Sequence, residues 1–294
     1  MGPSATITDS ERIAATLPCW SGPVAPVRLA GGISNDNFLI ADGGQKYVVR
    51  VNGDVPVHGV WRGNDATCNR AAAAVGIAPE VHFVADNAIV VDFIDGRTFG
   101  AEDVTVQANL ERILTLVKRT HGAAFHNIRG PVCAFWPFRV CRDYALYLRE
   151  QGSRMIPELD RLGEANARLE RIAGAMDVVL GHNDLLAANF VDDGERLWLI
   201  DWEHAGLSSP LFDLANLASN NGFSEAGETW LLENYFKEPA DEERRRRFLA
   251  MKCASLLREA MWSMASELTS TLDFDYQAYS REYLGRFEVA YARL

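Results

Sequence analysis

The spacing of apolar residues changes once along the chain, near residue 95. Before this point, short apolar or β-branched runs alternate with turns rich in Gly, Asp and Asn, a pattern typical of strands. After it, apolar residues recur every three or four positions over long segments, as in amphipathic helices. The 294 residues are enough for two domains or lobes. We therefore expect an α+β protein with a small β-rich N-terminal lobe, residues 1–95, and a larger, mainly helical C-terminal lobe, residues 96–294.

The first lobe is predicted to contain five strands, with one helix before the first strand and one after the third. The helices are expected over 9–17 and 65–75, and the strands over 27–29, 37–40, 46–51, 81–84 and 88–94. Thr8 is a suitable N-cap for the first helix, and Pro18 would end it.

The second lobe is predicted to be helical, with a short hairpin as its main β structure. Helices are expected over 106–125, 144–149, 158–176, 225–236, 241–268 and 276–291, and strands only over 178–180, 188–191 and 197–200. The basic run 244–247 follows three acidic residues at a predicted helix start, which favours a solvated helix face over nucleic-acid binding.

The charge balance argues against two classes of partner. The chain has 29 basic and 40 acidic residues, a formal net charge of −11. Nucleic-acid binding requires a basic surface, and anionic membranes repel an acidic one, so we expect neither partner. An acidic protein can attract a small cationic substrate.

The cysteines and the N-terminus indicate a reduced, cytoplasmic protein. Five scattered cysteines without CxxC spacing favour buried free thiols over disulfides or a zinc site. The first 20 residues show neither the basic nor the apolar segment of a secretory signal, and no apolar run approaches the roughly 20 residues of a membrane span.

The most informative stretch is residues 181–189, GHNDLLAAN, which precede the predicted hairpin. Asp184 and Asn189 lie on one short loop. Asp201 would end the second hairpin strand beside that loop, so three oxygen-bearing side chains can converge there. Taken alone, Asp184 and Asn189 also fit an Asx turn, and the position of Asp201 weakens that alternative.

Phosphoryl transfer requires such a set of side chains. One carboxylate orients and deprotonates the acceptor hydroxyl, while an amide and a second carboxylate hold Mg²⁺ against the phosphates. The pattern H-x-D-x-x-x-x-N with a later Asp is that of a kinase catalytic loop and its metal-binding Asp.

The sequence at this point resembles the aminoglycoside phosphotransferase and choline/ethanolamine kinase group, in the segments HNDLLAANF and LIDWEHAG. The resemblance implies a protein-kinase-like two-lobe fold and ATP-dependent phosphorylation of a small alcohol, with ATP and Mg²⁺. It implies that Asp184 is the catalytic carboxylate and that Asn189 and Asp201 bind the metal. It also implies supporting roles for His182 and Asp213 around the catalytic loop.

The resemblance extends to the predicted nucleotide side. Residues 31–35, GGISN, are similar to the nucleotide loop of the group, which implies phosphate contacts by Gly32, Ser34 and Asn35. A plain Gly-Gly turn between strands is the alternative.

Arg50 lies on the third predicted strand, where choline kinases also carry Arg. The resemblance implies that it contacts phosphate and pairs with Asp65 on the following helix, although most relatives have the longer Glu there. A surface arginine on an edge strand is the alternative. The segment 90–97 resembles the lobe-connecting hinge, which implies adenine contacts through the backbone of Asp92 and Ile94.

The C-terminal residues resemble the part of choline kinases that contributes aromatic side chains to the choline pocket. The matching positions are Trp262, Phe274 and Tyr279. Aromatic ring faces attract a quaternary ammonium. Without the upstream motifs, three aromatics near C-terminal helices indicate core packing.

Three substrate positions depart from the choline kinase pattern. His204 replaces Tyr, Glu259 replaces a second Trp, and Asn220 replaces a Glu. Glu203 and Glu259 could pair with an ammonium that donates hydrogen bonds. We therefore expect a small cationic alcohol, with choline or ethanolamine the best candidates. An aminoglycoside or thiamine type of kinase and a regulatory nucleotide-binding pseudokinase are the alternatives.

Overall fold

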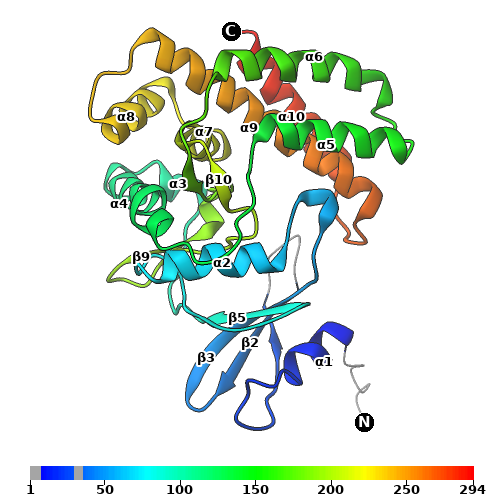
Figure 1. The fold of residues 1–294 in the computed structure, drawn as a ribbon, viewed down its shortest axis with the longest axis vertical. Coiled ribbons are helices and arrows are strands. Elements are labelled where there is room, and N and C mark those ends of the chain that lie inside the picture. Colours follow the sequence, from blue (N-terminus) through cyan, green and yellow to red (C-terminus); the bar gives the residue numbers. More distant parts are fainter. Residues whose placement is uncertain (1–7, 30–35) are drawn as a thin grey trace.

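The structure is a computed structural model that describes residues 8–29 and 36–294 (Figure 1). A five-stranded sheet forms the N-terminal part, with all neighbouring strands antiparallel in the order β1-β2-β3-β5-β4. Its strands are β1 (Val27–Arg28), β2 (Asp36–Asp42), β3 (Gln45–Val51), β4 (Val81–Ala85) and β5 (Ala88–Asp92). The five strands of this sheet all end before residue 95, where the change in apolar spacing predicts the end of the β-rich part.

Two helices pack on this sheet. The first, α1 (Asp9–Ala15), begins where Thr8 accepts a hydrogen bond from the Glu11 backbone, as predicted. It packs against β2 and β3, and Ala14 contributes to the sheet core. The second, α2 (Arg62–Ala73), begins three residues earlier than predicted and lies between the sheet and the helical part of the molecule (Figure 1).

Helices dominate the rest of the chain. They are α3 (Ala101–Val104), α4 (Gln107–Arg119), α5 (Pro137–Glu150), α6 (Ile156–Ala173), α7 (Pro210–Asn220), α8 (Glu225–Phe236), α9 (Glu242–Thr269) and α10 (Tyr276–Tyr291). Helix α9 is central, because α5, α6, α7 and α10 all pack against it. Its Asp241 N-cap accepts a hydrogen bond from the Arg244 backbone, so the basic run begins a helix as predicted.

Short elements complete this part of the chain. A π-helical turn, η2 (Thr120–Ala124), continues α4, and single 3₁₀ turns form η1 (Pro56–His58) and η3 (Ala187–Asn189). Two small sheets pair β7 (Val179–Gly181) with β10 (Gly206–Ser208), and β6 (Arg97–Thr98) with β8 (Phe190–Asp192) and β9 (Leu197–Leu199).

Several predictions of secondary structure were wrong. Helix α7 was missed because nearly all of it is buried, including the polar side chains of Asp213, Asn216 and Ser219, so its polar positions do not mark a solvent face. Strands β6 and β10 were missed because two or three residues are too short for a periodic signal.

The prediction that the cysteines are buried was wrong for two of them, since Cys19 and Cys133 are exposed.

The chain leaves the five-stranded sheet after Asp92, and β6 joins β8 in the helical part. We propose a lobe boundary between these elements, dividing the chain into 1–95 and 96–294. No helix in the described ranges is both long and apolar enough to cross a membrane.

Candidate active site

The loop after β7 is held from behind by the start of α7. The carboxylate of Asp213 accepts the backbone N–H groups of His182 and Asn183, at 2.8 and 2.6 Å. Asn183 has a left-handed φ of 64°, so this turn depends on the bonds that surround it. His182 lies against the carbonyl of Ile200 at 2.9 Å. The supporting roles predicted for His182 and Asp213 agree with these contacts.

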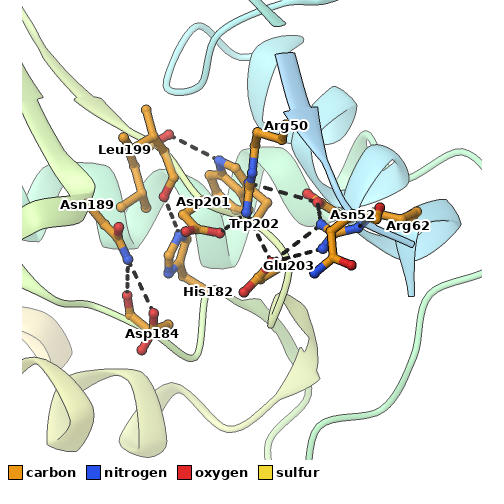
Figure 2. Close-up of polar contacts among 12 residues, drawn as sticks. Arg50, Asn52, Arg62, His182, Asp184, Asn189, Leu199, Asp201, Trp202 and Glu203 are labelled. Carbon is orange, nitrogen blue, oxygen red and sulfur yellow. Dashed lines mark hydrogen bonds and ion pairs between the residues drawn. The ribbon is translucent and has the colours of Figure 1, made fainter. Parts of the chain in front are cut away.

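The hairpin brings the metal-binding candidates together. β8 and β9 pair in register, and the Ile200 backbone donates to the Asn189 carbonyl at 3.0 Å, which sets Asp201 beside the loop. The Asn189 amide nitrogen donates to the backbone and carboxylate oxygens of Asp184, at 2.8 and 3.4 Å (Figure 2). Asp184, Asn189 and Asp201 all line one cavity of about 620 Å³, so the predicted convergence occurs.

Two arginines and two further carboxylates form a largely buried ion-pair network with Asp201. Arg50 donates to Asp201 at 2.6 Å and to Glu203 at 3.0 Å (Figure 2). The expected pair with Asp65 is present but longer, at 3.9 Å. Asp65 lies closer to Arg62, at 2.9 Å, and Arg62 also reaches Glu203 at 3.3 Å. Arg50 therefore links the N-terminal sheet to the predicted metal ligand rather than mainly to α2.

Burial and like charge control the ionisation of the acidic residues. Burial raises the pKa of the Asp184 carboxyl, Arg258 opposes that change, and the nearby carboxylates of Glu259, Asp201 and Glu203 raise it further. Burial also raises the pKa of Asp201, against the effect of its arginine partner. The cavity therefore gathers carboxylates that favour entry of cations.

The nucleotide candidates are only partly described. Asp92 and Ile94 line the same cavity, among the apolar side chains of Val48, Ile89 and Val91. The Asp92 backbone N–H donates to the Glu80 carbonyl at 3.0 Å, so an adenine contact at Asp92 would have to use its carbonyl.

Gly32, Ser34 and Asn35 lie outside the described residues. Their predicted contacts with phosphate stay predictions.

The cavity also contains five of the seven substrate candidates: Glu203, His204, Glu259, Trp262 and Tyr279. The rings of Trp262 and Tyr279 are 6.0 Å apart between centroids at 68°. Burial and Arg258 lower the pKa of the His204 imidazole well below its ordinary value, so this ring is neutral at pH 7.

The other two substrate candidates lie elsewhere. Phe274 packs 5.6 Å from the Tyr279 ring but does not line the cavity, and 37% of it is exposed. Asn220 ends α7 away from the cavity lining, and its buried amide nitrogen has no partner among the residues described.

Sequence reasoning missed two buried arginines. Arg62 and Arg258 are each only 2% exposed. Arg258 donates to Glu259 at 2.8 Å and lies 3.9 Å from the Asp184 carboxylate. Arg62 precedes Asp65 by three residues, a spacing that allows an ion pair on one face of a helix. The predicted helix began only at Asp65, so this pair was missed. The signal for Arg258 was weaker: Arg258 and Glu259 are oppositely charged neighbours about one helical turn before Trp262.

Known proteins match this chain over most of its length. A family model described as choline/ethanolamine kinase matches residues 27–251. The LicA protein of Haemophilus influenzae is 27% identical over 219 residues, 71% of this chain and 62% of its own length. Mouse ethanolamine kinase 2 is 27% identical over 258 residues, 79% of this chain and 66% of its own length. The chain thus spans slightly less than two thirds of both relatives.

Solved structures share the fold. A choline/ethanolamine kinase family protein from Mesorhizobium loti has a TM-score of 0.74 at 25% identity, covering 97% of this chain and 94% of its own. The choline kinase LicA of Streptococcus pneumoniae has a TM-score of 0.76 at 22% identity, covering 92% and 94%. The arrangement of a β-rich lobe and a helical lobe is therefore that of these kinases.

Proposed function

Because this chain belongs to the choline/ethanolamine kinase family, we propose that it transfers the γ-phosphoryl group of ATP to the hydroxyl of choline or ethanolamine. One observation carries the proposal: a single cavity is lined by Asp184, Asn189 and Asp201 together with the aromatic residues Trp262 and Tyr279. The first set suits phosphoryl transfer, and the second suits a small cation. ATP as the phosphoryl donor also supports a cytoplasmic protein.

Asp184 is the proposed catalytic residue. Its carboxylate would orient the acceptor hydroxyl and accept its proton as the new O–P bond forms in line with the bond to the leaving ADP. The Asn189 amide nitrogen donates to the Asp184 backbone carbonyl at 2.8 Å and to its carboxylate at 3.4 Å.

Asn189 and Asp201 are suited to Mg²⁺. The Asn189 amide nitrogen points to Asp184, which leaves its oxygen as a ligand atom, and Arg50 occupies only one oxygen of Asp201. Amide and carboxylate oxygens are preferred Mg²⁺ ligands, with phosphate oxygens and water completing the shell. Bound there, Mg²⁺ would supply neutralisation of the phosphate charge.

Arg50 is proposed to contact the nucleotide phosphates. Burial alone would lower its pKa, but the carboxylates of Asp201, Asp65 and Glu203 raise it, so the guanidinium stays charged. Its planar fork can donate to two phosphate oxygens at once, which a lysine ammonium does less specifically.

The acceptor end is proposed to bind the ammonium through ring faces. Both oxygens of Glu259 already accept hydrogen bonds, one from Arg258 at 2.8 Å and one from the Tyr279 hydroxyl at 2.9 Å. Glu203 accepts hydrogen bonds from Arg50 and Arg62 at its Oε2 atom. Carboxylates engaged in this way still add negative potential, but Trp262 and Tyr279 provide the contact surface.

The test is turnover of an acceptor panel with ATP and Mg²⁺. Choline, ethanolamine, thiamine and an aminoglycoside are compared by ADP release and by ³¹P NMR of the product, with Asp184→Asn as the blank. We expect choline or ethanolamine to be the preferred acceptor. Turnover of only another alcohol would contradict the substrate assignment, and ATP binding without turnover would favour a pseudokinase.

A further inference from the structure

Arg258 is a buried cation at the catalytic carboxylate. It lies on α9, is 2% exposed, and lines the same cavity as Asp184 and Trp262. Its Nε atom is buried without a hydrogen-bond partner among the residues described. Burying a guanidinium that is not fully paired destabilises a fold. A role in folding alone does not account for this arrangement.

The two oxygens of Asp184 face different partners. Oδ1 lies 3.9 Å from Arg258 Nη1, and Oδ2 lies 3.4 Å from the Asn189 amide nitrogen. One partner comes from helix α9 and the other from the catalytic loop, so together they restrict rotation of the carboxylate. We propose that Arg258 is a positioning residue that holds Asp184 in the orientation required for attack by the acceptor hydroxyl. This inference rests on the proposed kinase function.

Arg258 also contacts Glu259, and the test must distinguish this contact from the one with Asp184. The Nη1 atom of Arg258 lies 2.8 Å from the Glu259 carboxylate. If Arg258 served only to neutralise Glu259, removing both charges together would restore a sound site. If it positions Asp184, removing both would leave Asp184 without its α9 partner. The neighbouring residues thus allow a double-variant test.

The experiment compares wild type with Arg258→Gln, Glu259→Gln, the double variant Arg258→Gln/Glu259→Gln, and the conservative Arg258→Lys. Initial rates are measured against ATP and against the acceptor that wild type prefers, with thermal unfolding recorded for each protein. Arg154→Gln is the control. Arg154 pairs with Glu267, which lies on α9 as Arg258 does, but Arg154 does not line the cavity.

We expect the double variant to lose about 30-fold or more in kcat relative to Glu259→Gln, with the KM for ATP changed less than about threefold, as for loss of a transition-state interaction. Arg258→Lys should recover part of kcat, because it restores a positive charge without the guanidinium geometry. The Arg154→Gln control should keep the wild-type kcat.

Three results would overturn the inference. These are a double variant as active as Glu259→Gln, an effect confined to the KM of the acceptor, and full activity of Arg258→Lys. If the Gln variants do not unfold cooperatively, the Lys variant alone decides, since an unchanged kcat in it contradicts a geometric role. Wild-type protein that phosphorylates no alcohol would instead contradict the proposed function, and the inference with it.

Discussion

Arg50 and Asp201 lie 151 residues apart in the sequence, yet their side chains are joined by a 2.6 Å ion pair. Arg50 comes from β3 of the N-terminal sheet, and Asp201 follows the hairpin of the helical lobe. Asp201 also has a left-handed φ of 66°, a conformation that surrounding contacts must hold. This pair therefore joins the two lobes at the proposed metal ligand.

Removing Arg50 should change stability and metal affinity in opposite directions. Arg50→Met removes the arginine that pairs with Asp201 and leaves Asp65 and Glu203 paired with Arg62, so we expect a loss of about 3 kcal/mol in the free energy of unfolding. The site also becomes more negative, so Mg²⁺ should raise Tm more in the variant than in wild type. Calorimetry with and without Mg²⁺ measures both effects. Equal Mg²⁺ responses would contradict a metal site at Asp201.

Asp184→Asn should separate chemistry from folding. A general base contributes about 10²–10⁴-fold, so we expect kcat to fall by that factor. The pKa of this buried carboxyl is raised, so a neutral amide should leave Tm equal to or above that of wild type. Equilibrium binding of ATP should remain within a few fold. A retained kcat would exclude Asp184 as the base.

Asp213 should be required for the shape of the catalytic loop. It accepts two backbone N–H groups and also pairs with His121 at 2.9 Å. Asp213→Asn weakens a buried charged network, so we expect a loss of about 3 kcal/mol and a lower kcat. Asp160→Asn is the control, because that carboxylate is 88% exposed in its pair with Arg149. Similar urea midpoints for the two variants would contradict this role.

The acceptor pocket predicts a contrast between two aromatic residues. Trp262→Ala should raise the KM for choline about tenfold or more, since a desolvated cation–π contact contributes about 2 kcal/mol. Phe274→Ala should change it by less than about threefold, because Phe274 does not line the cavity. Equal effects in steady-state kinetics would show that Trp262 acts through packing rather than through contact with the ammonium.

His58 should make the fold sensitive to acid. Burial lowers its pKa to about 4, Arg258 acts in the same direction, and Glu203 opposes both. The ring also faces Tyr144, Ser266 and Trp262.

Because the folded state disfavours protonation of His58, its stabilising effect is complete above the ordinary histidine pKa of about 6.5. It should be lost progressively as pH falls from about 6.5 to 4, by about 3 kcal/mol in all. Urea unfolding of wild type and His58→Gln at pH 7.5, 6 and 5 should show wild type losing more stability than the variant on acidification. Parallel curves would show that another group is responsible.

The ends of two helices and the loop with Asp184 and Asn189 were predictable because their determinants are local, whereas α5 begins at Pro137, seven residues before the predicted 144–149. Helices α8 and α10 span the residues predicted for them, since apolar spacing and an N-cap act over a few positions. The same holds for Asp184, Asn189 and Asp201, which one loop and one hairpin bring together. Even so, residues 188–189 of the predicted strand belong to a 3₁₀ turn, because strand boundaries depend on pairing.

The sequence by itself determined where the chain changes from strands to helices and which loop carries the proposed oxygen ligands. Only the tertiary structure decided which charges lie side by side: Arg50 with Asp201, and Arg258 with Asp184. It also excluded Phe274 from the cavity lining, although that residue lies beside Tyr279. Helix capping and apolar periodicity act between near neighbours in the chain. The burial and pairing of charges depend on segments that meet only when the lobes pack together.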